Sequence, residues 1–508
     1  MRLLVAWVCV AASVAWCTQS AASLLPPAWR LDDRGLPNRE LHQTAPIQFG
    51  ANAPFDAPTG ADPAISWLIA ATGYAFDQAA QGRSGIVVGA QDCNFTFGQS
   101  DINGSYFWQS YDHDGHAGCL DGSLNNITTY FTTQAARVQP QSPVLVAASF
   151  HSVGEYPGSA WSAKIVRRDS AGNTKWFVDA GALSNINVKK PLLLSDDGSM
   201  LALLAANCSD GFDQRSTTVV VMDTENGRAL WSHHIPDIPY RAHLSDKRGP
   251  AAGGVVAVVA SASASFFDSS TGQTVAKQLQ LPSLTHATAL SSDATYFAAS
   301  HNSSVTLYQF SSAHTAYIQT ATLPLSASYP APEGVTWVPN GLLFAATGSL
   351  ALLIAGAAAS PNYQIVTLDA WSLPLPTTTE PTPLPTTQEA KPLWSFACDT
   401  PSRQQLQESF SAFNLVLSGS VLVVGSWGAG YGLTGNDRPT ARALCTASGK
   451  VAASFVSSGS VWDLSALEDD AGGFTVAVAA KHTHSNTVVP GGDFYFLHYN
   501  ASTVAACV

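Results

Sequence analysis

The stretch "TTVVVMDTENGRALWSHHI", residues Thr217–Ile235, decides the fold class. A run rich in β-branched residues ends at Asp223, a short polar segment follows, and a second strand-like run after Gly227 carries Trp231. Aspartate favours a turn because its carboxylate accepts hydrogen bonds from nearby backbone N–H groups, and glycine readily adopts the positive φ that closes such a turn. The stretch therefore predicts a β-hairpin.

This hairpin pattern recurs along the chain. The segment "AKIVRRDSAGNTKWFVDAG" places Asp169, Gly172 and Trp176 on nearly the same spacing, whereas "SASFFDSSTGQTVAKQLQL" keeps the aspartate and the glycine without the tryptophan. A degenerate copy, "ARALCTASGKVAASF", keeps Gly449. Upstream of several of these turns lies a hairpin of a second kind, as in "LLLSDDGSMLALLA" and "ATALSSDATYFAAS". Repetition of short strands with turns between them predicts an all-β protein.

The spacing of the turns points to a repeat architecture. It is 54 residues from Asp169 to Asp223 and 45 from Asp223 to Asp268, and a four-stranded propeller blade takes roughly 40 to 50 residues. The Asp–Gly–Trp hairpins resemble the repeat of quinoprotein-type (PQQ-like) β-propellers, and the Ser-Asp-Asp-Gly hairpins resemble those of WD-type propellers. The resemblance implies a fold and little about activity, because propellers host many unrelated functions.

We therefore expect an all-β fold: a single β-propeller of about seven four-stranded blades over residues 64–508, closed with an N-terminal strand. The terminal strands and the turns allow seven or eight blades, and we expect seven; the turns lie near Asp112, Asp169, Asp223, Asp268, Tyr308, Asp369 and Gly449. In quinoprotein dehydrogenases the resemblance would imply a cofactor stacked on adjacent, disulfide-linked cysteines. This sequence has no adjacent cysteine pair, so no cofactor-binding residue carries over and no cofactor is assigned.

The N-terminal sequence predicts secretion. Residues 1–22 have a positive charge, an apolar run and a small-residue end, which is typical of a signal peptide, and a Pro-rich segment follows over 23–63. Six cysteines remain as disulfide candidates, with Cys93 the natural partner of Cys119 and the other pairings open: Cys93, Cys119, Cys208, Cys398, Cys445 and Cys507. Six sequons are predicted glycosylation sites: Asn94, Asn103, Asn126, Asn207, Asn302 and Asn500. We expect a secreted, extracellular glycoprotein.

Two segments interrupt the repeat. Residues 372–392, "SLPLPTTTEPTPLPTTQEAKP", are Pro/Thr-rich and cannot bury a core, so we predict an insertion between the third and fourth strands of one blade. Residues 341–359, "GLLFAATGSLALLIAGAAA", are apolar or small throughout, as a membrane span would be. Gly348-Ser349 divides this run and Asn340-Gly341 is a hairpin turn signal, so we predict two buried strands, with a span as the alternative.

The stretch "YDHDGHAGCLDG", Tyr111–Gly122, has the look of a chemical site because it holds three carboxylates, two imidazoles and a thiol. An aromatic-rich strand ends at Asp112, and Gly115 follows three residues later, as Gly172 follows Asp169. We interpret the stretch as another blade turn.

A metal site is the alternative interpretation of the same stretch. The weak candidates for ligands are Asp112, Asp114 and His116. A calcium loop that begins at Asp112 would need a carboxylate at its twelfth position, where this sequence has Ser123. A zinc site built on His113, His116 and Cys119 has no obvious fourth ligand. The sequence therefore favours the turn.

The composition and the absence of known catalytic motifs narrow the range of functions that the sequence supports. Charged residues make up 12% of the chain and the net charge is −12, so nothing in the sequence would neutralise the phosphates of a nucleic acid. The sequence contains no G-x-S-x-G, His-Glu-x-x-His or glycine-rich phosphate motif, and we name no catalytic residue. We expect the innermost strands to carry mainly Val, Ala, Ser and Leu. We predict a binding module for a protein or glycan; the alternative is an extracellular hydrolase or metal-dependent enzyme with its site in the central channel.

Overall fold

The computed structural model describes residues 64–507 with gaps: the backbone of the strands β1 to β32, the short helix α4 (Ala501–Ala505) and part of the turns. Most of the described side chains lie within 193–325. The predicted signal peptide (1–22) and Pro-rich segment (23–63) lie outside the described residues, as do several connections, among them 113–129 and 374–390.

The strands follow one another in antiparallel sets, which we number by their order in the chain. Sheet 1 contains β2 (Tyr74–Gln81), β3 (Gly85–Gln91), β4 (Phe95–Ser100) and β5 (Tyr106–Asp112). Sheet 2 contains β6 (Tyr130–Ala136), β7 (Val144–Val153), β8 (Ala160–Arg168) and β9 (Thr174–Ala182). Sheet 3 contains β10 (Leu192–Leu194), β11 (Met200–Asn207), β12 (Ser216–Asp223) and β13 (Ala229–Ile235). Sheet 4 contains β14 (Pro239–Leu244), β15 (Val255–Ala260), β16 (Ser263–Asp268) and β17 (Thr274–Gln280).

The second half of the chain continues in the same way. Sheet 5 contains β18 (Thr288–Leu290), β19 (Tyr296–His301), β20 (Ser304–Ser311) and β21 (Ala316–Pro324). Sheet 6 contains β22 (Thr336–Thr347), β23 (Leu350–Ser360), β24 (Gln364–Leu373) and β25 (Trp394–Ala397). Sheet 7 contains β26 (Ser409–Ser418), β27 (Val421–Trp427), β28 (Ala441–Cys445) and β29 (Val451–Phe455). Sheet 8 contains β30 (Val461–Glu468), β31 (Phe474–Lys481), β32 (Gly492–Tyr499) and β1 (Ala64–Ala71).

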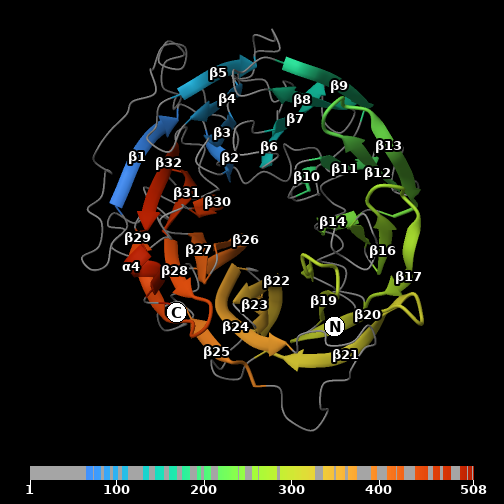
Figure 1. The fold of residues 1–508 in the computed structure, drawn as a ribbon, viewed down its shortest axis with the longest axis vertical. Coiled ribbons are helices and arrows are strands. Elements are labelled where there is room, and N and C mark those ends of the chain that lie inside the picture. Colours follow the sequence, from blue (N-terminus) through green and yellow to red (C-terminus); the bar gives the residue numbers. More distant parts are fainter. Residues whose placement is uncertain are drawn as a thin grey trace.

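The sheets are arranged as a ring (Figure 1). The first strand of each sheet lies nearest the centre and contacts the first strand of the next sheet, and β30 contacts β2 in turn. In sheet 8 the outermost strand is β1, which pairs antiparallel with β32 from the other end of the chain. A single pairing, Ile365 opposite Phe410, merges sheets 6 and 7 into one eight-stranded sheet. The predicted all-β propeller is confirmed.

The described strands form eight sets of four, one more than the expected seven. Our count relied on turns between third and fourth strands, and sheet 8 has no such turn because its fourth strand is β1. A strand ends at Asp112, as predicted, and the residues that follow it, 113–129, lie outside the described part of the chain. The equivalence of Asp112 with Asp169 was wrong. Asp112 ends β5, the outermost strand of sheet 1, whereas β4 and β5 are joined by residues 101–105. That connection contains Asp101 and Gly104, with the same Asp–Gly spacing as Asp169 and Gly172.

The core lies between neighbouring sheets. All six residues of β15 are buried. Val255 and Ala257 belong to a cluster shared with Phe297 of sheet 5, whereas Val256 belongs to a cluster shared with Val221 of sheet 3. Successive side chains of a strand point to opposite faces, so a second strand covered on both sides becomes a continuous apolar run.

The apolar segment 341–359 forms two paired strands, as predicted. Thr347 of β22 lies opposite Leu350 of β23, and buried residues of β23 alternate between the cluster shared with sheet 5 and the cluster shared with sheet 7. Within the described residues, no helix has the length and apolar character that crossing a bilayer requires. Asn340-Gly341 is not a hairpin turn: it lies inside β22, where the register with β23 shifts.

The Pro/Thr-rich segment 372–392 separates two paired strands. Asp369 of β24 lies opposite Ser395 of β25, and these are the third and fourth strands of sheet 6. This is the placement that the flanking sequences predict. The residues 374–390 themselves lie outside the described part of the chain.

Candidate functional site

The turn between β12 and β13 shows how the hairpin pattern folds. The Asp223 carboxylate accepts hydrogen bonds from the Glu225 N–H at 2.8 Å and from the Asn226 side-chain amide at 2.7 Å. The Gly227 N–H donates to the Asp223 carbonyl at 2.9 Å, and Gly227 has a φ of 70°. Glycine suits this position because the left-handed backbone is strained for other residues.

Asp268 repeats this arrangement in sheet 4. Its carboxylate accepts hydrogen bonds from the backbone N–H and the hydroxyl of both Ser270 and Thr271, at 2.6 to 3.0 Å. Burial opposes ionisation of the carboxyl group, but these hydrogen bonds outweigh burial and hold the pKa of Asp268 below its usual value. Both aspartates therefore build turns.

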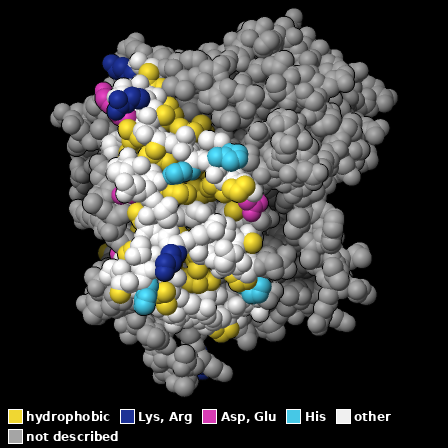
Figure 2. All heavy atoms as spheres, turned by 90° about the vertical axis from the view of Figure 1, so that its right-hand side faces the viewer, with side chains coloured by type: hydrophobic (Ala, Val, Ile, Leu, Met, Phe, Trp, Pro, Cys, Tyr) yellow, Lys and Arg dark blue, Asp and Glu magenta, His cyan; other side chains and the backbone are white. Residues whose placement is uncertain are grey.

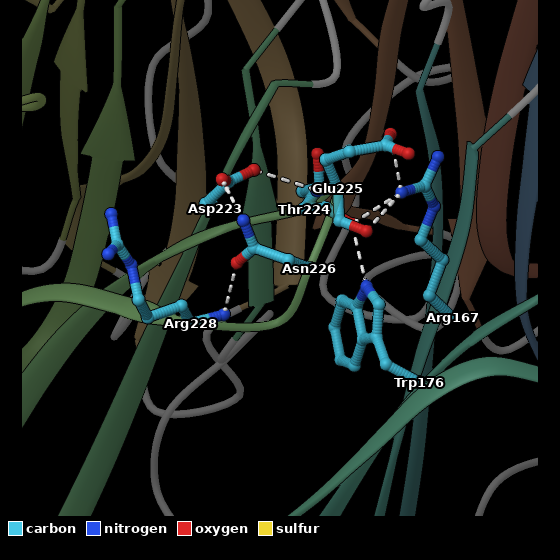
Figure 3. Close-up of polar contacts among 7 residues, drawn as sticks. All are labelled: Arg167, Trp176, Asp223, Thr224, Glu225, Asn226 and Arg228. Carbon is cyan, nitrogen blue, oxygen red and sulfur yellow. Dashed lines mark hydrogen bonds and ion pairs between the residues drawn. The ribbon is translucent and has the colours of Figure 1, made fainter.

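The tryptophans of the pattern contact the turn of the following sheet rather than their own turn. In each case the indole Nε1 donates to a backbone carbonyl, which we call a tryptophan contact: Trp176 to Thr224 at 2.7 Å (Figure 3), Trp231 to Ser269 at 2.8 Å, and Trp394 to Thr446 at 2.6 Å. The spacing within one hairpin does not reveal this, because donor and acceptor belong to different sheets. The tryptophan contacts join sheets 2 and 3, sheets 3 and 4, and sheets 6 and 7.

The turn glycines are needed for these tryptophan contacts as well as for their φ. A Cβ on Gly272 would lie 2.7 Å from Cγ and Cδ2 of Trp231. Gly227 and Gly449 approach their tryptophans equally closely, with corresponding distances of 2.7 and 2.6 Å. A side chain at any of these positions would have to displace the indole.

Sheets 4 and 5 meet without a tryptophan contact. Ala276, 1% exposed, stands in β17 where Trp231 stands in β13. The turn that it faces has Thr315, with a φ of 49°, at the position of Gly272. A backbone hydrogen bond joins the sheets there, from the Lys277 N–H to the Thr315 carbonyl at 2.9 Å.

Arg167 adds an ionic contact between sheets 2 and 3 (Figure 3). Its Nη1 donates to the carbonyls of Thr224 and Glu225 at 2.8 and 2.9 Å and to the Glu225 carboxylate at 2.7 Å. The Arg167 side chain is 11% exposed and that of Glu225 is 79% exposed. The guanidinium is therefore buried against carbonyls while its carboxylate partner stays in water. The equivalent position in sheet 3 is Val221, so this contact is not part of the repeat.

A serine after the first strand is a second repeated feature. In three sheets the serine N–H donates a hydrogen bond to the carbonyl of the first residue of the second strand. The serine Oγ accepts a hydrogen bond from the N–H of that same residue. The pairs, all at 2.8 to 3.0 Å, are Ser195 with Met200, Ser245 with Val255, and Ser291 with Tyr296. The sequence pattern identified the first and third hairpins. It missed the second because "LSDKRGPAAGGV" has a longer turn.

First strands also carry a feature that the sequence did not reveal. Four of them contain a β-bulge near their N-terminal end, where the register with the second strand shifts by one residue. The extra residues are Phe76 in β2, Tyr240 in β14, Asn340 in β22 and Trp462 in β30. The residues that follow them are Asp77, Arg241, Gly341 and Asp463.

The innermost strands agree in part with our expectation of Val, Ala, Ser and Leu. The sequences LLL of β10 and TAL of β18 fit it, whereas β2, β14 and β30 also contain aromatic and charged residues. In β14, the Nε2 atom of His243 lies 2.9 Å from the Thr288 hydroxyl of β18, which joins the first strands of two sheets.

The predicted metal ligands are not brought together in the described part of the chain. Asp112 is the last residue of β5, and Asp114 and His116 lie outside the described residues. Among the described residues, no group of three or more His, Cys, Asp or Glu side chains is placed to hold a metal ion. The metal candidate therefore stays a prediction.

The disulfide and glycosylation candidates are described only in part. Cys445 and Cys507 form a disulfide, and the other candidates, Cys93, Cys119, Cys208 and Cys398, lie outside the described residues. Asn207 is the last residue of β11. The remaining sequons lie outside the described residues and stay predictions: Asn94, Asn103, Asn126, Asn302 and Asn500.

Comparison with known proteins supports the fold alone. No family model and no curated protein matches the chain. Among solved structures, Sqt1 of Saccharomyces cerevisiae is similar at 9% identity and a TM-score of 0.52, covering 84% of this chain and 96% of that one. The C-terminal WD40 domain of Sif2 covers the same shares at 9% identity and a TM-score of 0.47. The Dos1 propeller is 12% identical over 84% of this chain and 92% of that one, with a TM-score of 0.45.

Proposed function

We propose that this chain is a secreted, glycosylated β-propeller that binds a protein or glycan partner. The observation that carries the proposal is the contrast between first and second strands. Second strands such as β15 are apolar and buried, which is what the packing of the ring requires. Phe76-Asp77, Tyr240-Arg241 and Trp462-Asp463 lie at bulges of first strands, so each of these three strands carries a charged residue next to an aromatic one. Bulges are frequent beside functional sites.

The sequence and one structural feature support the secreted part of the proposal. Residues 1–22 read as a signal peptide, and six sequons are spread along the chain. The Cys445–Cys507 disulfide is of the kind that persists in oxidising compartments. Enzymatic removal of N-linked glycans from the native protein should lower its mass; an unchanged mass would count against secretion.

The tryptophan contacts support a quinoprotein-type origin for the repeats. Trp231 pairs with Gly272 across a sheet boundary, and the Asp–Gly–Trp hairpin is the element that resembles that family. The proposal concerns the scaffold only, since no residue of this chain matches the adjacent-cysteine motif that would hold the quinone.

Partner binding is tested on the full chain, purified from a secreting host. The immobilised protein is presented to arrays of extracellular protein domains and of glycans, and each hit is measured again with the partner immobilised instead. We expect a saturable partner with a micromolar or tighter Kd. Turnover of a small substrate without any macromolecular partner would overturn the proposal.

An extracellular hydrolase is the second candidate, because Asp77 and Asp463 lie on β2 and β30, which are neighbours in the ring. Glycosidases in general work with a pair of carboxylates. Mass spectrometry of oligosaccharide mixtures incubated with the protein would detect cleavage. Hydrolysis that is lost in both the Asp77→Asn and the Asp463→Asn variants would favour this candidate over binding.

A further inference from the structure

The turn between β12 and β13 contains a chemically labile pair, Asn226-Gly227, in which the asparagine side chain is exposed. Asparagine is a thermolabile residue, and a following glycine has no Cβ to shield its backbone nitrogen. That nitrogen can lose its proton to hydroxide and attack the side-chain carbonyl carbon, which closes a five-membered succinimide. The displaced nitrogen takes a proton from water and leaves as ammonia. A second water molecule then opens the ring to aspartate or isoaspartate.

The folded turn opposes this reaction at both ends. The attacking nitrogen is engaged, because the Gly227 N–H donates to the Asp223 carbonyl at 2.9 Å. The amide of Asn226 is held as well: its Nδ2 donates to the Asp223 carboxylate at 2.7 Å, and its Oδ1 accepts from the Arg228 N–H at 2.8 Å (Figure 3). The ring of Trp176 lies against Gly227 and limits rotation of the peptide there. The turn must therefore open before the succinimide can form.

The fold does not require asparagine at this position. In the corresponding turn of sheet 4 the position belongs to Thr271, and in sheet 7 it belongs to Ser448. The Thr271 hydroxyl accepts from the Gln273 N–H at 3.3 Å, as the Asn226 amide oxygen accepts from the N–H two residues on. A hydroxyl side chain serves as an acceptor there and cannot form a succinimide. The chemical lability is therefore particular to the turn of sheet 3.

Conversion would act on the junction between sheets 2 and 3. An aspartate at position 226 would place a second carboxylate where the Asn226 amide now donates to Asp223, and like charges repel. Isoaspartate would in addition lengthen the main chain of the turn by one atom. Both changes displace Thr224, whose carbonyl accepts hydrogen bonds from Trp176 and Arg167 of sheet 2.

We propose that Asn226 is a deamidation site that the Asp223 turn restrains in the folded protein, and that its conversion loosens the junction between sheets 2 and 3. The hydrogen bonds of Asn226 and Gly227 carry the first part, and the contacts of Thr224 carry the second. This modification is separate from partner binding and does not rest on it.

The restraint is measured on the full-length protein in mildly alkaline buffer, native or denatured in guanidinium chloride. Peptide mapping follows the appearance of aspartate and isoaspartate at position 226. The native rate should be at least about tenfold slower, because a hydrogen bond to a carboxylate must break first. Asp223→Ala should raise the native rate at least about fivefold. Asp268→Ala is the matched control, since it removes the corresponding carboxylate of sheet 4 and should leave the rate unchanged.

The consequence is measured by denaturant unfolding after prolonged native incubation. Aged wild type should unfold at a lower denaturant concentration, in proportion to the fraction converted at Asn226. Aged Asn226→Thr should lose less, and its loss gives the contribution of the two other Asn-Gly pairs, Asn103-Gly104 and Asn340-Gly341. Freshly purified Asn226→Asp should already unfold more easily than Asn226→Thr.

Equal rates in native and denatured wild type, or no conversion at Asn226 in either, would overturn the restrained site, and this comparison requires no variant to fold. An equal acceleration in Asp223→Ala and Asp268→Ala would overturn the role of Asp223. Equal losses of stability in aged wild type and aged Asn226→Thr would overturn the effect on the junction between sheets 2 and 3. Circular dichroism of each variant checks that the fold is retained.

Discussion

The boundary between sheets 3 and 4 and the boundary between sheets 4 and 5 join neighbouring sheets by different means. At the first boundary Trp231 donates to the Ser269 carbonyl and its ring lies against Gly272. At the second boundary Ala276 and Thr315 occupy the matching positions. Where the tryptophan is absent the glycine is absent too, although Thr315 keeps a positive φ. The comparison indicates that the close approach of the indole restricts this turn position to glycine more strictly than the positive φ does.

At the boundary between sheets 4 and 5, contacts between aromatic rings join the two sheets. The rings of Phe266 and Tyr317 lie 4.3 Å apart between centroids, and the ring of Phe297 meets that of Phe266 edge-on at 5.4 Å. The Tyr317 hydroxyl donates to the Ala294 carbonyl at 2.7 Å. Figure 2 shows the flank of the ring that carries β13 and β17, where few of the described side chains are charged. Two kinds of aromatic contact therefore serve the same purpose in one ring.

The largest effect is expected from removing a buried tryptophan contact. Trp394 is 7% exposed and donates to the Thr446 carbonyl. Trp394→Ala should lower the free energy of unfolding by about 3 to 5 kcal/mol, because it opens a cavity and removes a hydrogen bond. Chemical denaturation measures this. Trp231→Ala, at a more exposed position, should have a smaller effect, and equal losses would contradict the role of burial.

The dependence of glycine on tryptophan can be measured with a double-mutant cycle. Gly272→Ala should cost about 2 to 4 kcal/mol of unfolding free energy, since it combines a left-handed φ with a clash against Trp231. In a Trp231→Ala background the same substitution should cost only about 1 to 2 kcal/mol, the contribution of φ. Thr315→Ala is the control at the other boundary and should change little. Additive costs would show that the indole does not impose the glycine.

Much of the fold could be predicted from the sequence, because turn chemistry is local. Asp223 and Gly227 fix a hairpin within a few residues, and the continuous apolar run of β15 follows from burial on both faces. The tryptophan contacts and the central bulges could not be predicted, because each depends on a residue of another strand or sheet. Trp394 is 52 residues from its acceptor, and the bulge at Trp462 is defined only by the register with β31.

The aromatic contacts between sheets 4 and 5 can be tested with a substitution at Tyr317. Burial, and to a lesser extent the nearby Asp293, raises the pKa of its hydroxyl. Tyr317→Phe should cost about 1 to 2 kcal/mol of unfolding free energy, because the Ala294 carbonyl loses its donor. The neutral phenol is favoured in the folded state, so its stabilisation is complete below about pH 10 and is lost as pH rises further. The wild type should therefore lose stability above pH 10 more steeply than the variant, and parallel curves would contradict the raised pKa.

The smallest effect is expected at the Asp268 turn. Hydrogen bonds from Ser270 and Thr271 lower the pKa of this carboxyl despite its burial. A lowered pKa in the folded state stabilises the protein above about pH 4 and loses that contribution as pH falls through the folded value. Asp268→Asn should therefore reduce the difference in melting temperature between pH 6 and pH 3. Ser270→Ala, which keeps the carboxylate, should reduce the difference less, and an unchanged difference in both variants would contradict this role.

Closure of the ring by β1 is tested most directly by a cysteine pair placed at Ile69 and Phe494, which lie opposite each other in the pairing of β1 with β32. Opposed Cα atoms in antiparallel strands are about 4.5 to 5.5 Å apart, within disulfide range. Peptide mapping of the oxidised native protein should find Ile69→Cys linked to Phe494→Cys, and no link when the second cysteine is placed at Leu497 instead. Absence of the first link, or equal linkage at both positions, would contradict a ring closed in this register.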